Sequence, residues 1–207
     1  MALATEYSAN GSGYGFGMIN VSTRGDTRFA GTIPSGARFT AGLRLDSAET
    51  APLCIFQRAS GRTIFGRVHF RDLPGESDAD AVLHAQQVLA ADETINLKAA
   101  RFNGFLGQGA QSKSSTGQAA LAVAVTRPGE AQIAGQVTGR TSFIGSAASG
   151  EFLSLKVSPR TGLFSGACTT IGKPPLNFAG ALFRKTDQEG YGRGRAISAA
   201  VQVTAVP

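Results

Sequence analysis

The chain has 207 residues and a formal net charge of +6, and 42% of its residues are hydrophobic while 16% are charged. This balance is too apolar and too weakly charged for a disordered chain. Glycine contributes 27 residues without recurring at every third position, which excludes a collagen-like helix.

The N-terminal segment gives no targeting signal. Residues Met1–Tyr7 have neither a basic start nor an apolar stretch, so we expect no signal peptide within this chain. The sequence also contains no apolar run long enough for a transmembrane helix, and we therefore expect no membrane span.

Alternation of apolar and polar residues is the main structural signal. It runs through residues 38–45, 153–158 and 197–204, and apolar residues two apart lie on one face of a strand. Turn signals with glycine separate the alternating segments. They occur at Gly25, Gly36, Gly61, Gly129, Gly162 and Gly190. The pattern predicts an antiparallel meander of about twelve strands.

A short unit recurs along the chain: a bulky apolar residue, any residue, glycine, any residue, and then usually an apolar residue. It starts at Phe29, Ile64, Phe102, Ile133, Phe164 and Phe178. Glycine on the apolar face of a strand predicts a bend, a bulge or a close approach of two backbones. Two further glycine runs, 13–17 and 190–194, echo each other, and we expect their strands to lie close together at the two ends of a closed sheet.

Residues 78–98 depart from this pattern because they are rich in Ala, Gln and Leu, which favour helix. We predict a strand to about residue 86, followed by an irregular or partly helical connector to residue 99. Residues 107–117 are small and polar, which favours a flexible loop.

The two halves of the chain resemble each other. Residues 19–34 align without a gap with residues 123–138, and four positions are identical, among them Gly25 with Gly129 and Gly31 with Gly135. Such self-similarity indicates a duplication. We therefore predict one all-β domain, 1–207, with halves at 11–86 and 117–204 and a connector at 87–116. We expect the strands to form a closed antiparallel barrel or a tightly packed sandwich around a shared core.

No pattern indicates catalysis. Residues 107–114 lack the glycine that precedes lysine in a phosphate-binding loop, and the acids between 72 and 80 lack the spacing of a calcium loop. His69 and His84 are the only imidazoles, and neither has a nucleophile and an acid at a recognisable spacing. We expect a non-enzyme with no metal site and no cofactor.

Cys54 and Cys168 lie one in each half of the chain. They are too few for a disulfide scaffold or a zinc site. Two interpretations remain open, a single bridge between the halves or two buried thiols.

The positive charge suggests a possible ligand. Basic residues flank the predicted hairpins near residues 58–71 and 184–195, and a barrel that joined them would present an anion-binding face. These residues are Arg58, Arg62, Arg67, Arg71, Arg184, Lys185, Arg193 and Arg195. Because few aromatic residues lie among them, nucleic acid is the less favoured polyanion.

Longer motifs resemble a known family. They are Gly31-Thr-Ile, Gly66-Arg-Val-His-Phe70, the run Thr161-Gly-Leu-Phe-Ser-Gly166, Phe178-Ala-Gly180 and Gly190-Tyr-Gly192. They are similar to a duplicated β module found near the C-termini of large secreted or surface proteins of bacteria, whose role is unassigned. Where that family has a tryptophan after its first half, this sequence has His84-Ala85.

The resemblance implies an extracellular or cell-surface location and partners such as other domains of a larger surface protein or a cell-surface polymer. We therefore expect a non-catalytic structural or adhesion-type β module. The alternative is a binding module for an acidic polymer, glycan or nucleic acid, that uses the arginine-rich hairpins.

Overall fold

The computed structural model describes residues 1–7, 14–58, 61–74, 77–87, 92–101, 119–183, 190–194 and 199–206. These residues form sixteen strands, and every pair of neighbouring strands is antiparallel. The prediction of an antiparallel all-β fold is confirmed. Within the described ranges, no helix has the length and apolar character needed to cross a membrane.

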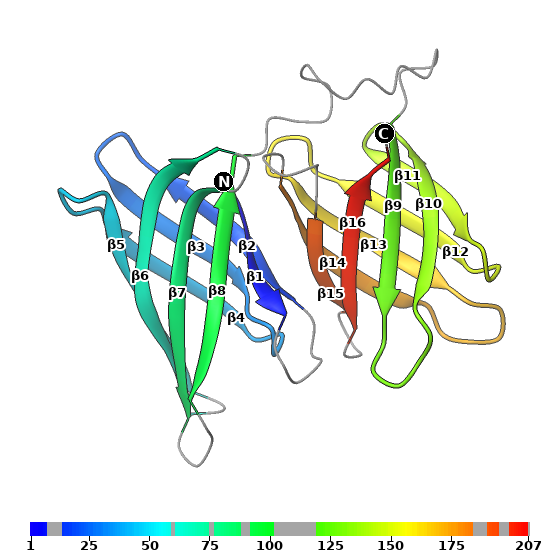
Figure 1. The fold of residues 1–207 in the computed structure, drawn as a ribbon, viewed down its shortest axis with the longest axis horizontal. Helices are drawn as coiled ribbons and strands as arrows, with labels where there is room; N and C mark the ends of the chain where they lie inside the picture. The colour runs from blue at the N-terminus through cyan, green and yellow to red at the C-terminus, as the bar shows by residue number, and fades with distance from the viewer. Residues whose placement is uncertain are drawn as a thin grey trace.

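The first unit is an eight-stranded sheet with the order β4-β3-β2-β1-β8-β7-β6-β5. Its strands are β1 (Ala2–Tyr7), β2 (Tyr14–Val21), β3 (Asp26–Thr32), β4 (Arg38–Arg44), β5 (Thr50–Gln57), β6 (Arg62–Leu73), β7 (Ser77–Gln87) and β8 (Glu93–Ala100). The first and last strands pair, so β4 and β5 are the edges. In Figure 1, β5 to β8 lie in front of β2 to β4, so the sheet folds over its own core.

The second unit is a closed barrel in which each strand pairs with the next and the last strand pairs with the first. Its strands are β9 (Ala119–Thr126), β10 (Ile133–Gly139), β11 (Ser142–Ala147), β12 (Phe152–Val157), β13 (Leu163–Thr169), β14 (Leu176–Leu182), β15 (Gly190–Gly194) and β16 (Ala200–Ala205). Eight strands give an interior that side chains fill completely. The barrel therefore needs no strand from the first unit.

The prediction of one twelve-stranded barrel with a shared core is not confirmed. One large cluster of buried side chains, from Leu121 to Val203, belongs to the barrel. The other, from Ile19 to Ala99, belongs to the first sheet. Alternation showed which side chains turn inward, but it could not show which strands share an interior, because strand pairing is a long-range property.

The connector predicted at 87–116 is also wrong in part. The strand predicted to end near residue 86 is β7, but residues 93–100 form β8 rather than an irregular or helical segment. Ile95, Leu97 and Ala99 are buried and alternate with more exposed residues, so the local period is that of a strand. The helix-favouring composition of residues 78–98 outweighed this short alternation in the sequence-based prediction. Residues 102–118, with the predicted loop, lie outside the described residues.

The sequence repeat and the structural repeat do not coincide. The aligned segments form the hairpins β2–β3 and β9–β10. However, β2 is the second strand of its meander, whereas β9 is the first of the barrel. The registers also differ, since Ile19 pairs with Phe29 while its aligned counterpart Val123 pairs with Gly135. The duplication therefore stays a prediction.

Strand glycines bring backbones together as expected. A Cβ atom on Gly17 would lie 2.7 Å from the Cα atom of Gly31, and one on Gly180 would lie 2.6 Å from the Cα atom of Gly192. No side chain fits at these crossings, so the repeated glycine has a packing role in both units.

Candidate functional site

The two units meet along β14 and β15 of the barrel. Leu176, Phe178 and Leu182 of β14 face the barrel core, so the residues between them face outward. Even so, Ala179 and Ala181 are buried, because strands of the first unit cover them. Small side chains at these positions let the two β surfaces approach closely.

Aromatic and polar contacts hold this junction at one end. The rings of Tyr14 on β2 and Tyr191 on β15 lie 4.8 Å apart between centroids, and Phe183 packs near the same tyrosine with its buried ring. The side-chain amide of Gln202 donates a hydrogen bond of 2.9 Å to the Tyr14 hydroxyl. The strands of the two echoing glycine runs, β2 and β15, therefore lie together as predicted, although they belong to different sheets.

Arg193 on β15 crosses from the barrel to the first unit. Its Nη1 donates a hydrogen bond of 2.6 Å to the Pro34 carbonyl, and its Nε donates one of 3.0 Å to the Gly194 carbonyl. Burial lowers the pKa of this guanidinium, because a charged group loses solvation there. In the described part of the chain, no carboxylate forms an ion pair with Arg193. Both acceptors are neutral carbonyls, so neither hydrogen bond neutralises the positive charge of Arg193.

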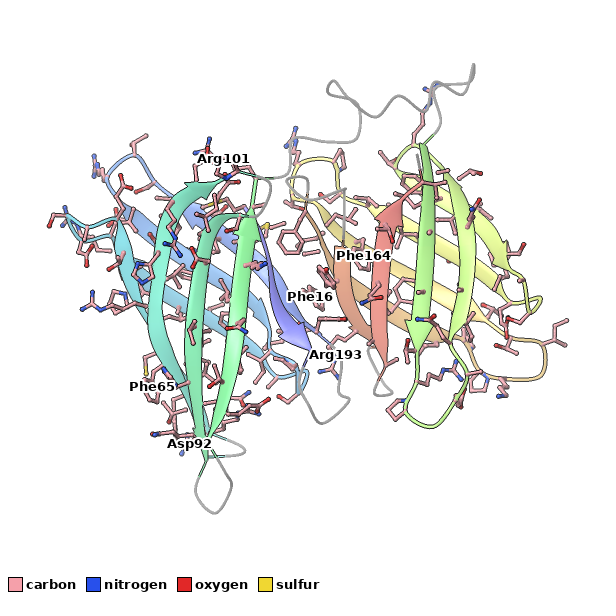
Figure 2. The ribbon with its side chains drawn as sticks, viewed as in Figure 1. Phe16, Phe65, Asp92, Arg101, Phe164 and Arg193 are labelled. Carbon is pink, nitrogen blue, oxygen red and sulfur yellow. The ribbon has the colours of Figure 1, made fainter. Side chains whose placement is uncertain are left out.

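A groove of about 1110 Å³ opens beside Arg193, between the outer faces of the two units. Figure 2 shows Phe16, Phe164 and Arg193 together at this junction. One wall comes from β2, β3 and the turn before β4, and the other comes from β12 to β15. Its half-buried apolar lining includes Phe16, Met18 and Leu163, while Val157 and Phe164 lie beneath it in the barrel core.

The charges of the groove have one sign. Arg38, Lys156 and Arg193 line it, and the described lining contains no Asp, Glu, His or Cys. None of these three cations is ion-paired with a described carboxylate. Apolar walls with cations that no described carboxylate pairs suit an anionic ligand that also has apolar surface.

Of the eight predicted anion-binding residues, Arg193 lines this groove. Arg38 and Lys156 were missed, because each is one polar residue in an alternating strand and nothing local distinguishes it from other outward positions. Their joint placement depends on how the two sheets pack.

The arginines of the first predicted hairpin have carboxylate partners instead. Arg71 makes two hydrogen bonds to Asp80, of 2.7 and 2.8 Å, and Arg62 pairs with Glu93. The hydrogen bond from Arg71 is also the main reason that the pKa of Asp80 is lowered. Arg58 is exposed just after β5. The pairing compensates most of the positive charge on this hairpin.

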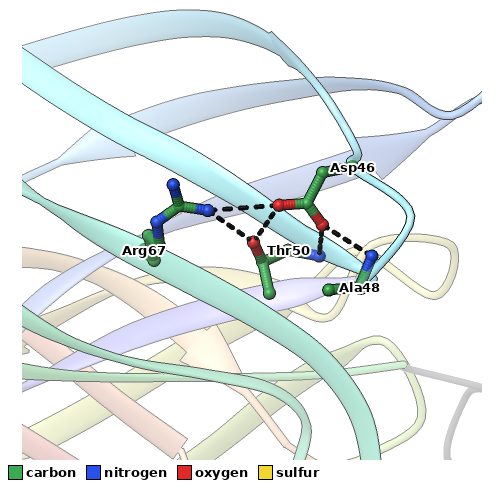
Figure 3. Close-up of polar contacts among 4 residues, drawn as sticks. All are labelled: Asp46, Ala48, Thr50 and Arg67. Atoms are coloured by element: carbon green, nitrogen blue, oxygen red, sulfur yellow. Dashed lines mark hydrogen bonds and ion pairs between the residues drawn. The ribbon is translucent and has the colours of Figure 1, made fainter.

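Arg67 belongs to a turn network at the start of β5 (Figure 3). It donates a hydrogen bond of 3.1 Å to Asp46, which also accepts 2.7 Å and 2.9 Å bonds from the Thr50 hydroxyl and amide and a 3.0 Å bond from the Ala48 amide. The hydroxyl bond is the largest cause of the lowered pKa of Asp46.

The single anion-binding face predicted from all eight residues is not formed by those that the structure describes. β6 lies on the far side of the first sheet from β1 and β2, which contact the barrel. Arg184, Lys185 and Arg195 lie outside the described residues.

The remaining candidates do not gather into a reactive site. His69 and His84 are both exposed. Cys54 is exposed on β5, and Cys168 is buried in the barrel with a raised thiol pKa caused mainly by desolvation. Both thiols are free, so the prediction of two buried thiols is wrong for Cys54, which takes an outward position in its strand. Among the residues that the structure places, no three His, Cys, Asp or Glu side chains form a metal site.

Comparison with known proteins assigns no family. No family model matches the chain, and no curated protein matches it. Among solved structures, it is similar to the apo crystal structure of the haemoglobin receptor HpuA from Kingella denitrificans, with 13% sequence identity and a TM-score of 0.38. The match covers 100% of this chain and 87% of that chain. The family resemblance noted in the sequence stays a prediction.

Proposed function

We propose that this chain is a non-catalytic binding module of a secreted or cell-surface bacterial protein, and that an acidic polymer binds in the groove between its two β units. The location rests on the resemblance of its motifs to the bacterial surface module. An acidic glycan is the favoured ligand, because such a chain presents carboxylate or sulfate groups together with the apolar faces of its sugar rings.

The observation that carries this proposal is the charge of the groove. Arg38 comes from the first unit, whereas Lys156 and Arg193 come from the barrel, so an anionic chain seated there would contact both units. Arg193 is already partly desolvated and held by two backbone carbonyls, so little ordering is needed when it binds an anion. Phe16 and Met18, which are half-buried on the outward face of β2, supply apolar surface near the charges.

The test is a salt titration of binding to heparin, a sulfated polysaccharide. Because each cation that contacts a polyanion releases counterions, three groove contacts predict a slope of the log affinity against log salt of up to about 3 in magnitude. The double variant Arg38→Ala/Lys156→Ala removes two exposed cations, and neither residue belongs to a hydrophobic core. We expect it to lower the affinity at least about tenfold and to reduce the slope by about 2.

The matched control is Arg24→Ala/Arg58→Ala, which makes the same change in net charge at two exposed turn positions outside the groove. It should leave the affinity within about twofold, since distant surface charges are screened by salt. Equal losses in the two double variants, or binding that does not respond to salt, would overturn the proposal.

A further inference from the structure

The guanidinium of Arg193 lies against the turn between β3 and β4. Gly36 in this turn has a φ angle of 89°, and a Cβ atom on it would lie 2.5 Å from Nη1, 2.8 Å from Cζ and 3.0 Å from Nη2 of Arg193. Because these three distances are similar, the Cβ atom would lie over the flat face of the guanidinium and not beside its edge. Any residue other than glycine at this position would therefore displace the guanidinium.

Part of the hydrogen-bonding capacity of Arg193 is unused. A guanidinium has five N–H donors in one plane. Arg193 uses one on Nη1 for the Pro34 carbonyl and the one on Nε for the Gly194 carbonyl. Within the part of the chain that the structure describes, no residue accepts a hydrogen bond from Nη2. Since Arg193 lines the groove, both donors on Nη2 and one on Nη1 remain for a ligand there.

The backbone around this guanidinium adds no further donors. Pro34 has no N–H, and the amide of Gly36 donates to the Ile33 carbonyl at 2.8 Å. The amide of Gly194 donates to the Ala199 carbonyl at 3.0 Å. A sulfate ester carries its charge on three terminal oxygens, whereas a carboxylate has two, and two parallel N–H bonds from a guanidinium satisfy a carboxylate. The donor set therefore suits a carboxylate better than a sulfate.

Arg193 differs from the other two cations of the groove in its burial. Arg38 and Lys156 are exposed, whereas Arg193 is half-buried. Charge pairs at partly buried sites are screened less by water and salt than pairs at exposed sites. An anionic group gains more at Arg193 than at the two exposed cations.

We propose that Arg193 binds the carboxylate of a uronic acid unit of the acidic glycan, and that Gly36 is the positioning residue for its guanidinium. This inference rests on the proposed function, because the glycan must occupy the groove, and it names the anionic group that the groove selects. Arg38 and Lys156 attract the chain by their charge, whereas Arg193 adds directed hydrogen bonds from a planar group.

The test compares binding of the full chain to heparin and to carboxyl-reduced heparin, in which hydroxymethyl groups replace the carboxylates and the sulfates remain. We expect the wild type to bind native heparin at least about tenfold more tightly, because hydrogen bonds to a charged acceptor are lost with the carboxylates. Arg193→Lys keeps the positive charge but lacks the planar fork, so the ratio of the two affinities should shrink to about threefold or less.

Gly36→Ala tests the positioning role, because its Cβ atom displaces the guanidinium, and it should reduce the same ratio. The matched control is Gly150→Ala. Gly150 has a similar φ angle of 91°, lies in a turn outside the groove and has no atom within 4 Å of an added Cβ atom. The control introduces the same backbone strain and should leave the ratio unchanged. A merely structural role of Gly36 would weaken binding to both heparins equally.

Equal affinity of the wild type for the two heparins would overturn this inference, even if the variants do not fold. If Arg38→Ala/Lys156→Ala still loses affinity in that case, the groove keeps its proposed function and selects sulfate instead. An Arg193→Lys variant with the wild-type ratio would also contradict the inference. No binding of native heparin by the wild type would overturn both the proposed function and the role of Arg193.

Discussion

The two β units share a strand order but differ in whether their sheet closes. Each arranges eight strands as a meander and pairs the first with the last, but the barrel also pairs its fourth and fifth strands, β12 and β13, along their lengths. The corresponding strands of the first unit, β4 and β5, do not pair. Pro52 lies where a ladder to β4 would need a donor, and Asp46 bonds locally to Ala48 and Thr50 instead. Pro52 therefore removes one donor from any ladder between β4 and β5.

The largest expected effect is the loss of stability when a phenylalanine is truncated, and it should differ between the two cores. Phe178 is 1% exposed inside the closed barrel, whereas Phe39 is half-buried at the open edge. Phe178→Ala should lower the free energy of unfolding by about 3–5 kcal/mol and Phe39→Ala by about 1–2 kcal/mol. Chemical denaturation, with amide hydrogen exchange as the readout for each unit, measures the loss of unfolding free energy in both variants. Equal losses would mean that the first sheet is closed in solution.

Strand glycines give the next contrast. Gly180→Ala would force a Cβ atom against the Gly192 backbone, and we expect a loss of about 1–3 kcal/mol. Gly42→Ala meets open space and should be neutral or stabilising by about 0.5 kcal/mol, because alanine loses less backbone entropy on folding. Thermal melts of the two variants compare these effects directly, and a destabilised Gly42→Ala would show that something covers the outward face of β4.

The turn before β5 predicts a pH dependence. The pKa of Asp46 is lower in the folded chain than its ordinary value, chiefly because the Thr50 hydroxyl donates to it. Its contribution to stability is therefore fully present above the unfolded pKa of about 3.9 and is lost as the pH falls through the folded pKa. Asp46→Asn should be less stable than the wild type at neutral pH, and the difference should shrink below about pH 4. A difference that persists at lower pH would mean that the turn does not depend on the carboxylate charge.

The smallest effect concerns thiol chemistry rather than stability. Cys54 is exposed at the open edge and Cys168 is buried in the barrel, where desolvation raises its pKa. A thiol reagent should modify Cys54 rapidly and Cys168 only after unfolding. Mass spectrometry of partially labelled chain identifies the site, and early labelling of Cys168 would indicate that the barrel opens.

The candidate groove shows where prediction from sequence stops. Arg193 was identified from its place in a basic hairpin, yet its hydrogen bond joins residues 159 positions apart in the chain. Arg38 and Lys156 come within one groove only because β1 and β2 pack against β14 and β15 of the barrel. Conversely, nothing in the sequence indicated that Arg62, Arg67 and Arg71 have acidic partners, because these acids lie on β8, in the turn before β5 and on β7.

The sequence by itself determined the strand class and the turns, because alternation and glycine conformation are local. Leu153, Leu155 and Val157 are buried as predicted, and Gly25 and Gly129 adopt positive φ angles of 81° and 75° at their turns. Only the tertiary structure decided that eight strands close into a barrel, that eight others stay open, and that three cations share a groove. These features depend on pairing and packing between distant segments, for which no single stretch of sequence encodes the partner.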